Sequence, residues 1–328
     1  MTSASLDIVA IGDALVDVIA TADDSFVEHR GLPKGGMQLL TTDQADELYA
    51  AMGPAREISG GSAANSMASA AALGLAVAFV GQVADDQLGE IFGHDMRSLG
   101  VRFETAPLAS PPPTGRCLIV VTPDGQRTMN TCPGASHRLS PEALDEKLIA
   151  SASVLMLEGY LWGPELPRRA LMRAIEIARG SGPEIAFTLS ESVCLPGRRE
   201  ALTQMIGSGG VDLLFMNEHE ALQLTGEREL GNALGLLAAK VGTLVITRGP
   251  KGALGLHKGT TIEVAAAPVE QVVDTTGAGD LFAAGFLAAR CRGRDLKSSL
   301  EAGAICAAEI ISHFGARPEA DLRELTGL

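Results

Sequence analysis

Short runs of apolar residues alternate with helix-length segments along most of the chain. The first run, Ile8–Ile11, ends at Gly12-Asp13, and a second follows at Val77–Val80. Further runs with similar spacing lie at Val154–Leu157, Ile185–Leu189, Leu213–Met216 and Leu244–Ile246. Buried strands separated by helix-length segments are typical of βαβ units. The pattern therefore predicts one large α/β domain with a mostly parallel sheet.

Two helices can be placed between these strands from their end signals. One begins after Gly60-Gly61-Ser62, continues through an Ala-rich stretch to Leu73 and ends at Gly74. The other spans Asp86–Leu99 and ends at Gly100. Glycine often follows the last turn of a helix, because it adopts the left-handed conformation without strain.

Two early segments break this pattern and predict a smaller second unit. Residues 23–49 are polar and contain few apolar positions. The strand-like runs Gly115–Val121 and Gln126–Thr131 flank Pro123-Asp124-Gly125, a hairpin signal. The large domain then comprises residues 1–19, 48–112 and 132–328, and a β-rich lid comprises residues 20–47 and 113–131. Because open parallel sheets bind ligands beyond their strand C-termini, a lid at those ends is placed to cover a site.

Composition narrows the classes of partner and compartment. The 328 residues carry a formal net charge of −14, and so acidic a surface repels nucleic acid and anionic membranes. The N-terminus lacks the features of a signal peptide, and the apolar runs are too short to span a membrane. The cysteines are scattered, at Cys117, Cys132, Cys194, Cys291 and Cys306. With an odd count and no C-x-x-C pair, we expect reduced thiols in a cytoplasmic protein rather than disulfides or a zinc site.

The strongest chemical signal is the segment Asp274–Asp280, which reads Asp-Thr-Thr-Gly-Ala-Gly-Asp. It follows the strand-like Val272-Val273 and precedes an Ala-rich helix. Its glycines allow a tight turn whose N–H groups approach a ligand, and the helix N-terminus adds unpaired donors. These features predict an anion hole for a phosphoryl group, with Asp280 placed to accept the proton of an attacking hydroxyl. The pattern alone also fits a glycine turn with Asp280 as a helix cap.

Three weaker clusters lie at predicted helix starts or strand ends. Gly60-Gly61-Ser62 leads into a helix that carries Asn65, whose amide can donate to and accept from substrate hydroxyls. Asn217 and Glu220 lie three residues apart, a spacing that suits water-mediated binding of Mg²⁺. The turn Thr247–Gly252 can approach a nucleotide, with Arg248 or Lys251 near phosphate. Each of these clusters, taken alone, fits a simple turn or helix cap better.

Together and in this order, the clusters resemble the ribokinase-like (PfkB) family of carbohydrate and nucleoside kinases. The resemblance extends from Ile8 to Pro318. Asp274–Asp280 is similar to the family's C-terminal signature, and Gly60–Asn65 to its N-terminal one. The resemblance implies a three-layer α/β/α sandwich with a small β lid, and an ATP-dependent phosphotransferase that uses Mg²⁺.

The resemblance also implies a role for each matching position. Asp280 would be the base, and the N–H groups of Gly277, Ala278 and Gly279 would form the anion hole. ATP and Mg²⁺ would be bound by Asn217, Glu220, Thr247, Arg248, Gly249, Gly252 and Thr276. The substrate would be held by Asp13, Asp17, Gly60, Gly61, Ser62 and Asn65. Many members also bind a monovalent cation such as K⁺, which would lie near Asp274.

Four segments are similar to the bacterial adenosine-kinase-like branch of the family: Lys34–Met37, Arg127–Thr131, Glu158–Trp162 and Gly315–Pro318. The lid residues Met37, Leu39 and Met129 would then cover a purine, although they fit the lid's own core equally well. Asp13 departs from this branch, whose members carry Asn here, and an ionised carboxylate only accepts hydrogen bonds. We therefore expect transfer of the ATP γ-phosphoryl group to a primary hydroxyl of a nucleoside, adenosine first. A free sugar such as ribose or fructose is the alternative.

Two other classes fit the sequence less well. A non-catalytic nucleoside- or sugar-binding protein needs no base at Asp280. A nicotinamide dehydrogenase needs G-x-G-x-x-G after the first strand, and a P-loop protein needs G-x-x-x-x-G-K-[ST]; neither motif occurs. The oligomeric state stays open between monomer and homodimer, because exposed lid edges can pair with another strand.

Overall fold

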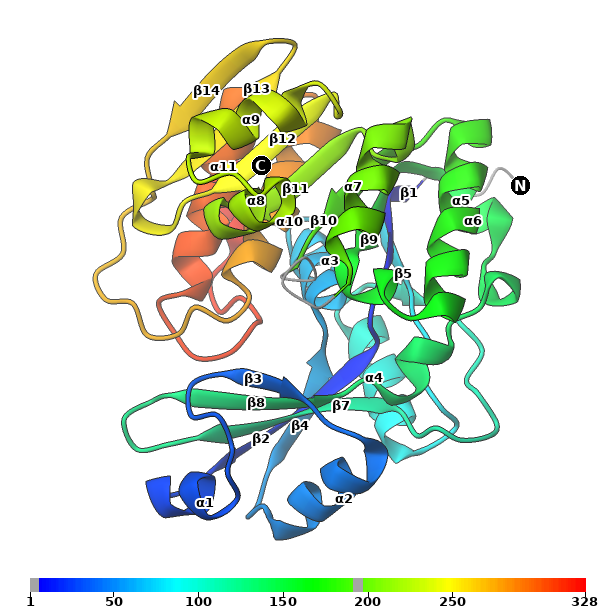
Figure 1. Ribbon diagram of the computed structural model, residues 1–328, viewed down its shortest axis with the longest axis vertical. Helices are drawn as coiled ribbons and strands as arrows, with labels where there is room; N and C mark the ends of the chain where they lie inside the picture. Colours follow the sequence, from blue (N-terminus) through cyan, green and yellow to red (C-terminus); the bar gives the residue numbers. More distant parts are fainter. Residues whose placement is uncertain (1–5, 191–196) are drawn as a thin grey trace.

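The computed structural model describes residues 6–190 and 197–328. Within these residues, nine strands form one sheet in the order β14-β13-β12-β11-β10-β9-β1-β5-β6 (Figure 1). They are β1 (Leu6–Ile11), β5 (Val77–Val80), β6 (Arg102–Phe103), β9 (Ala152–Glu158), β10 (Glu184–Thr188), β11 (Leu213–Asn217), β12 (Thr243–Thr247), β13 (Ala253–His257) and β14 (Thr260–Val264). β13 pairs antiparallel with both β12 and β14, and the other neighbours are parallel. The predicted mostly parallel sheet is confirmed.

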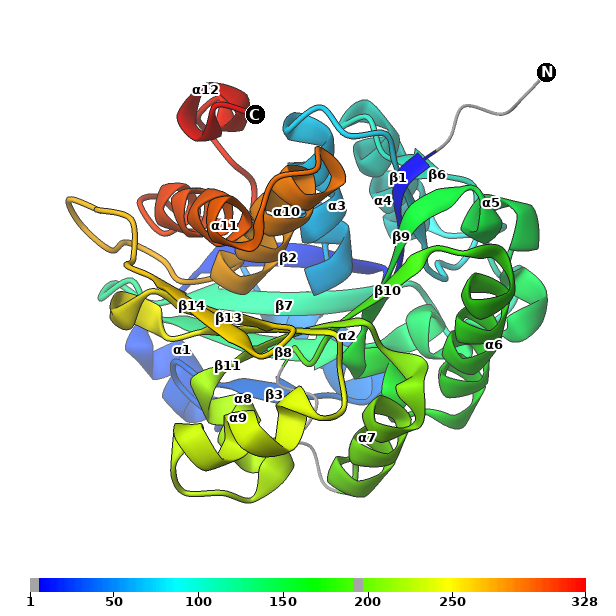
Figure 2. The same cartoon turned by 90° about the horizontal axis from the view of Figure 1, so that it is seen from above.

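Helices cover both faces of this main sheet, because alternate residues of its strands enter two separate cores. Ile8 and Ala10 of β1 lie in one core, and Val9 and Ile11 lie in the other. The first core is covered by α3 (Ser62–Ala72), α4 (Gln87–Ser98), α10 (Ala278–Cys291), α11 (Leu296–Ile310) and α12 (Leu322–Thr326). The second is covered by α5 (Glu146–Ala150), α6 (Glu165–Ser181), α7 (Arg199–Met205), α8 (Glu218–Thr225) and α9 (Leu230–Ala238). Figure 2 shows the resulting three layers, which confirm the expected α/β/α sandwich.

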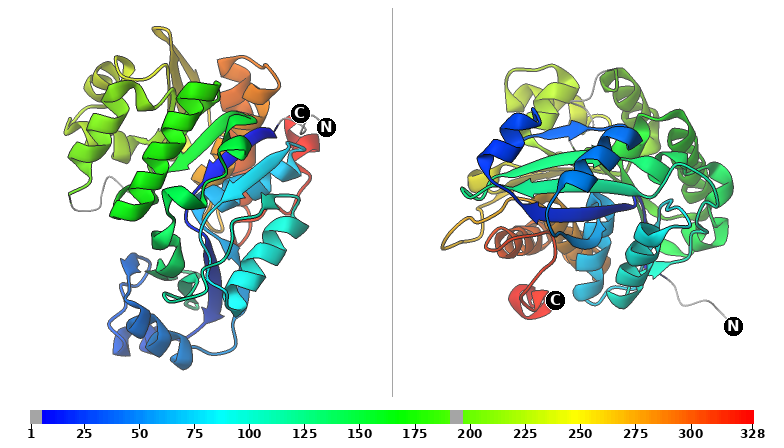
Figure 3. Two further views of the ribbon diagram at one scale, coloured as in Figure 1. Left: turned by 90° about the vertical axis from the view of Figure 1, so that its right-hand side faces the viewer. Right: turned by 90° about the horizontal axis from the view of Figure 1, so that it is seen from below.

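A second sheet forms the lid, which projects from the edge of the main sheet where the parallel strands end (Figure 3). Its order is β3-β8-β7-β2-β4. The strands are β2 (Leu15–Thr21), β3 (Met37–Leu39), β4 (Arg56–Gly60), β7 (Gly115–Val121) and β8 (Arg127–Cys132), and the lid helices are α1 (Asp24–His29) and α2 (Thr42–Ala51). Val16, Val18 and Leu118 pack with Ala45 and Leu48 of α2, so one face of the lid sheet is buried. The other face is turned toward the main sheet.

The lid extends further along the chain than its expected segments. β2 begins at Leu15 and β4 ends at Gly60, so both belong to the lid sheet and not to the large domain. The error at β2 arose because its apolar residues follow β1 after only three residues. The expected strand at Val272-Val273 is also wrong: these residues form no strand, and Val272 is 58% exposed.

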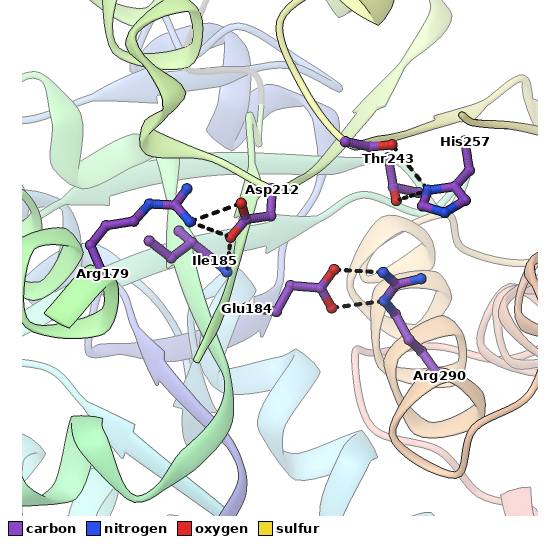
Figure 4. Close-up of polar contacts among 8 residues, drawn as sticks. Arg179, Glu184, Ile185, Asp212, Thr243, His257 and Arg290 are labelled. Carbon is purple, nitrogen blue, oxygen red and sulfur yellow. Dashed lines mark hydrogen bonds and ion pairs between the residues drawn. The ribbon is translucent and has the colours of Figure 1, made fainter. Parts of the chain in front are cut away.

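Charged side chains at the N-terminal edge of the main sheet are paired with one another (Figure 4). Arg179 donates to both carboxylate oxygens of Asp212, at 2.8 and 2.9 Å, and the Ile185 N–H donates to the same carboxylate. Glu184, the first residue of β10, accepts two hydrogen bonds from Arg290 of α10 at 2.5 and 2.7 Å. These ion pairs join helices to the starts of strands, and each arginine is neutralised by a carboxylate.

Two further expectations from the sequence concern the cellular compartment of the protein. Among the described residues, no helix is both long and apolar enough to cross a membrane. Of the cysteines, Cys117, Cys132, Cys291 and Cys306 are unpaired, and Cys194 lies outside the described residues.

Candidate active site

The segment with the strongest chemical signal forms a turn and the start of α10. Gly277 has φ 80°, a left-handed conformation that glycine adopts without strain, and α10 begins at Ala278. Asp280 lies in the first turn, beside N–H groups that have no partner within the helix. The N–H of Ala278 already donates to the Thr275 carbonyl at 3.2 Å. In this conformation an anion hole therefore depends on Gly277 and Gly279 rather than on all three expected donors.

The carboxylate of Asp280 is held by two residues of α3. The Ser62 hydroxyl donates to Oδ1 at 2.5 Å, and the Asn65 amide donates to Oδ2 at 3.0 Å. Ser66 donates to the backbone carbonyl of Asp280 at 3.1 Å. The two glycine turns that were singled out in the sequence thus meet in space, although Asn65 and Asp280 are 215 residues apart.

Burial raises the pKa of Asp280 above its ordinary value, and the Ser62 and Asn65 hydrogen bonds and the charge of Arg317 oppose that shift. A buried carboxylate with a raised pKa is a better proton acceptor than an exposed one, and its hydrogen bonds fix its direction. Such a group is suited to general-base catalysis near neutral pH.

A second carboxylate lies close by, at the end of the lid sheet. Asp17 of β2 pairs with Ile58 of β4, and a Cβ placed on Gly60 would come within 2.5 Å of its Oδ1. Burial raises the pKa of Asp17 to about 6, while Arg317 and Arg127 lower it. Gly60 is therefore needed to leave room for this side chain.

Asp13 lies between the two sheets, just after β1. Its Oδ1 accepts a hydrogen bond from the Ser136 hydroxyl at 2.6 Å, and its side chain is buried. Burial raises the pKa of Asp13, and nearby His137 opposes that shift. Gly61 has φ 95°, and a Cβ there would come within 2.2 Å of the Asp13 carbonyl oxygen. The backbone can pass this point only because Gly61 has no side chain.

Glu158 lies beneath this region, at the end of β9, and is fully buried. Its Oε2 accepts a hydrogen bond from the Ala63 N–H at 2.8 Å, so it supports the start of α3. Burial, together with the charges of Asp13 and Asp280, raises the pKa of Glu158 well above its ordinary value. The neutral form of Glu158 is therefore favoured by its surroundings.

An arginine of the lid contacts the loop that precedes α10. Arg127 of β8 forms an ion pair with Asp274 at 2.9 Å, and the two side chains are only 10% and 7% exposed. The other donors to Asp274 are the Thr276 N–H and the Gly315 N–H, each at 3.0 Å. Both oxygens of Asp274 thus have donor partners, and Arg127 supplies the nearby positive charge. The Asp274 side chain is thus engaged by protein donors, and the monovalent cation expected near this loop stays a prediction.

The site-facing side of the lid is identified by the alternation of β8. Because side chains alternate along a strand, Met129 and Thr131 lie on the same face as Arg127, which reaches the large domain. Met37 pairs with Met129, and Leu39 pairs with Thr131 and is 51% exposed. Met37, Leu39 and Met129 are absent from the buried core that α2 covers. They form a partly exposed apolar surface instead.

The expected nucleotide-binding residues are neighbours at the ends of two parallel strands. Asn217, at the end of β11, lies beside Thr247, at the end of β12. Asn217 and Glu220 form a reciprocal cap at the start of α8: Asn217 Oδ1 accepts from the Glu220 N–H, and Glu220 Oε2 accepts from the Asn217 N–H, at 2.8 and 2.7 Å. Since each side chain uses an oxygen for the backbone and Glu220 is buried, these residues fit Mg²⁺ only through water.

The turn that follows Thr247 is a hairpin between β12 and β13. The Gly252 N–H donates to the Gly249 carbonyl at 2.9 Å. Arg248 forms ion pairs with Glu263 at 3.0 Å and Glu218 at 3.8 Å, and Lys251 lies 3.7 Å from Glu218. Both cations therefore have acidic partners at this end of the sheet.

Sequence reasoning assigned no site role to Arg127, Glu158 and Arg317. The guanidinium of Arg317 donates to Asn65 Oδ1 and, at 2.7 and 2.9 Å, to the carbonyl and hydroxyl of Ser59. The signal that could have found these residues is their place in the segments similar to adenosine-kinase-like sequences. Nothing in their local pattern indicates that they meet.

Both the sequence and the fold are similar to those of known proteins. Residues 5–322 match the pfkB family carbohydrate kinase. The chain belongs to this family. An adenosine kinase from Sinorhizobium meliloti is 45% identical, with 98% of each chain covered and a TM-score of 0.91. A probable sugar kinase from Rhizobium etli is 40% identical, with 99% of this chain and 98% of the other covered and a TM-score of 0.92.

A ribokinase from Bacillus subtilis is 27% identical over 311 residues, which cover 95% of this chain and 94% of the relative. The pfkB membership establishes that the chain is an ATP-dependent kinase of sugars or nucleosides. The relatives differ in the substrates that their names state.

Proposed function

We propose that this pfkB kinase transfers the γ-phosphoryl group of ATP to the primary hydroxyl of a nucleoside, with adenosine as the first candidate. The observation that carries the proposal is the pairing of two features across the site. On one side, Ser62 and Asn65 hold the Asp280 carboxylate at the start of α10. On the other side, Met37, Leu39 and Met129 present apolar surface from the lid.

Asp280 acts as the base in this proposal. Its carboxylate accepts the proton of the substrate hydroxyl, and the oxygen of that hydroxyl then attacks the γ-phosphorus in line with the leaving ADP. The N–H groups of Gly277 and Gly279 donate to the oxygens of the transferred group. Mg²⁺ bound with the nucleotide neutralises charge on the phosphates. Asn217, Glu220 and Thr247 would lie on the nucleotide side, where the first two would hold the ion through water.

Arg127 belongs to the same proposal. It extends from the lid to the loop that leads into the anion hole. Its position therefore depends on the orientation of the lid relative to the large domain. A lid that closes over the site excludes water, which limits hydrolysis of ATP.

The lid surface favours a nucleoside over a free sugar. A purine is flat and largely apolar, and it needs cover that a free sugar does not need. The lid has a separate buried core on its other face, so Met37, Leu39 and Met129 are not required to build it. Ligand sites are commonly lined by such apolar side chains with few polar groups.

The second candidate is a free sugar such as ribose, and Asp13 is the observation that favours it. Its buried carboxylate lies at the junction of the two sheets, and an ionised carboxylate accepts hydrogen bonds from hydroxyl groups. The Ser136 hydroxyl occupies one of its oxygens, so fewer acceptor positions remain for a substrate. A ribose moiety that is already part of a nucleoside satisfies the same contact.

The experiment is a measurement of ADP formation from ATP and Mg²⁺, with adenosine, inosine, guanosine, ribose or fructose as the acceptor. We expect the highest kcat/KM with a nucleoside and at least about 100-fold less with ribose, because a free sugar leaves the apolar lid surface without a partner. A ribose value equal to or above the nucleoside values would contradict the proposed substrate class. Mass spectrometry of the product checks that the phosphoryl group is on the acceptor.

A further inference from the structure

Arg317 connects three parts of the molecule that meet at the site. It lies in the segment between α11 and α12, and its guanidinium donates to Asn65 of α3 and to Ser59 of the lid strand β4. The N–H of Ser59 donates in turn to Asp95 of α4 at 2.9 Å. β4 is the strand through which the chain returns from the lid to the catalytic helix α3. Arg317 therefore holds the end of this lid strand and the residue that contacts Asp280.

The contact with Asn65 determines which way its amide faces. A guanidinium carries donors only, so it selects the amide oxygen, Oδ1. The NH₂ group then faces Asp280, whose ionised carboxylate carries acceptors only. The hydrogen bonds from Arg317 to Asn65 and from Asn65 to Asp280 thus run in one donor-to-acceptor direction. The Asn65 amide cannot flip without losing hydrogen bonds at both ends.

We propose that Arg317 is a positioning residue for phosphoryl transfer, because it orients the Asn65 amide toward Asp280 and supplies positive charge to a cluster of buried carboxylates. This inference rests on the proposed role of Asp280 as the base. Arg317 influences Asp280 indirectly, through its hydrogen bond to Asn65 and through its positive charge.

The groups around Asp280 show why that charge is needed. Asp17 approaches from the lid and Glu158 from β9, and the charge of Asp280 contributes to the raised pKa of each. From α3, Ser62 and Asn65 are neutral donors. The charge of Arg317 lowers the pKa of both Asp17 and Asp280, and Arg127, which is paired with Asp274, also lowers that of Asp17. Burial lowers the pKa of Arg317 itself, whereas Asp17, Asp95 and Asp280 raise it.

The direction of the pH effect follows from the base role. Asp280 accepts a proton only in its ionised form, so activity falls as the pH decreases through its pKa. Removing the Arg317 charge raises that pKa, because burial then acts with less opposition. The acid limb of the pH profile of kcat/KM must therefore move to higher pH.

The test compares Arg317→Met with Arg290→Met. Arg290 lies on the same helix as Asp280 and pairs with Glu184 at the opposite edge of the sheet, so its removal also breaks a partly buried ion pair. For Arg317→Met we expect kcat/KM about tenfold lower at pH 8.5 and an acid limb shifted upward by about half a pH unit or more. Arg290→Met should leave both unchanged.

A second variant and a rescue keep the test decisive if Arg317→Met folds poorly. Arg317→Lys retains the charge but lacks the planar fork, so turnover should fall several-fold while the acid limb stays in place. Guanidinium ion added to Arg317→Ala should restore part of the turnover. An equal loss of activity at every pH in Arg317→Met, or an acid limb that moves as far in Arg317→Lys as in Arg317→Met, would overturn the inference.

Asp280→Asn separates this inference from the proposed function. If Asp280→Asn retains turnover, the base assignment fails. If Asp280→Asn is inactive and the Arg317→Met profile is merely lowered in parallel, the base assignment stands and the role of Arg317 is wrong.

Discussion

Both edges of the main sheet contain ion pairs, such as Arg248 with Glu263 at the C-terminal edge, but they differ in the buried carboxylates that lie near them. At the N-terminal edge, Arg179 pairs with Asp212 and Arg290 pairs with Glu184, so charges are matched (Figure 4). At the C-terminal edge, burial raises the pKa of Asp13, Asp17 and Asp280. Matched pairs at a partly exposed edge contribute modestly to stability, whereas carboxylates kept in a costly environment indicate function. The comparison separates the residues that join the layers from those proposed to act on a substrate.

The largest expected effect on activity comes from substituting one glycine near each edge of the main sheet. Gly61, at the C-terminal edge, and Gly182, before β10, both have left-handed φ values, 95° and 110°. A Cβ on Gly61 would come within 2.2 Å of the Asp13 carbonyl oxygen, whereas nothing lies within 4 Å of a Cβ on Gly182. We expect Gly61→Ala to lower kcat/KM by about 100-fold or more, because it displaces the start of α3 with Ser62 and Asn65.

Gly182→Ala is the control for backbone strain. It should cost about 1 kcal/mol in the free energy of unfolding and leave turnover unchanged. Steady-state kinetics and urea unfolding of both variants provide the measurement. Equal losses of activity in the two variants would contradict the view that only one edge is functional.

A smaller effect is expected on the substrate side of the lid. Met129→Lys places a charge on the apolar surface opposite the main sheet, so the KM for the nucleoside should rise about tenfold, with the KM for ATP little changed. Met172→Lys is the matched control, because Met172 is 50% exposed on α6 at a distance from the lid. Kinetics with each substrate varied in turn measure the effect. An unchanged nucleoside KM in Met129→Lys would remove this surface from the site.

The smallest effect concerns stability and the pKa of Asp17. Because that pKa is raised to about 6, the neutral form of Asp17 is favoured in the folded protein. Its contribution to stability is complete below the ordinary pKa of an aspartate and is lost as the pH rises through about 6. Relative to Asp17→Asn, the wild type should therefore lose on the order of 2 kcal/mol between about pH 4 and pH 7.

Urea unfolding of both proteins across this pH range tests the Asp17 prediction. The difference between the two unfolding free energies must change with pH in the stated direction. A constant difference would show that Asp17 ionises as an ordinary surface aspartate and would weaken the contrast between the two edges.

The strands of the main sheet could be predicted because both of their faces are buried. Ile8–Ile11 and Leu213–Met216 are continuous apolar runs for this reason, and the structure places strands at both. The lid sheet is buried on one face only, and its alternating polar residues resemble loops. β4 was consequently assigned to the large domain, as was most of β2 because it follows β1 so closely, and β3 is only three residues long.

The site could be predicted where chemistry and backbone geometry coincide. Gly61 and Gly277 occur where a left-handed turn opens a helix, so the sequence pointed to Ser62, Asn65 and Asp280. Arg317 and Arg127 contact residues 252 and 149 positions away, Asn65 and Thr276 respectively, and no local pattern records such contacts. Their roles follow only from the packing of the lid and the C-terminal segment around α3 and α10.

The most direct test of the account is the turnover of Asp280→Asn beside that of Glu184→Gln, measured as ADP formation with saturating ATP, Mg²⁺ and the best acceptor. Both variants remove one carboxylate charge, one at each edge of the sheet. The account predicts that Asp280→Asn loses about 10²–10⁴-fold in kcat while it remains folded and binds ATP, and that Glu184→Gln keeps nearly full activity. Near-normal turnover in Asp280→Asn would contradict the assignment of Asp280 as the base.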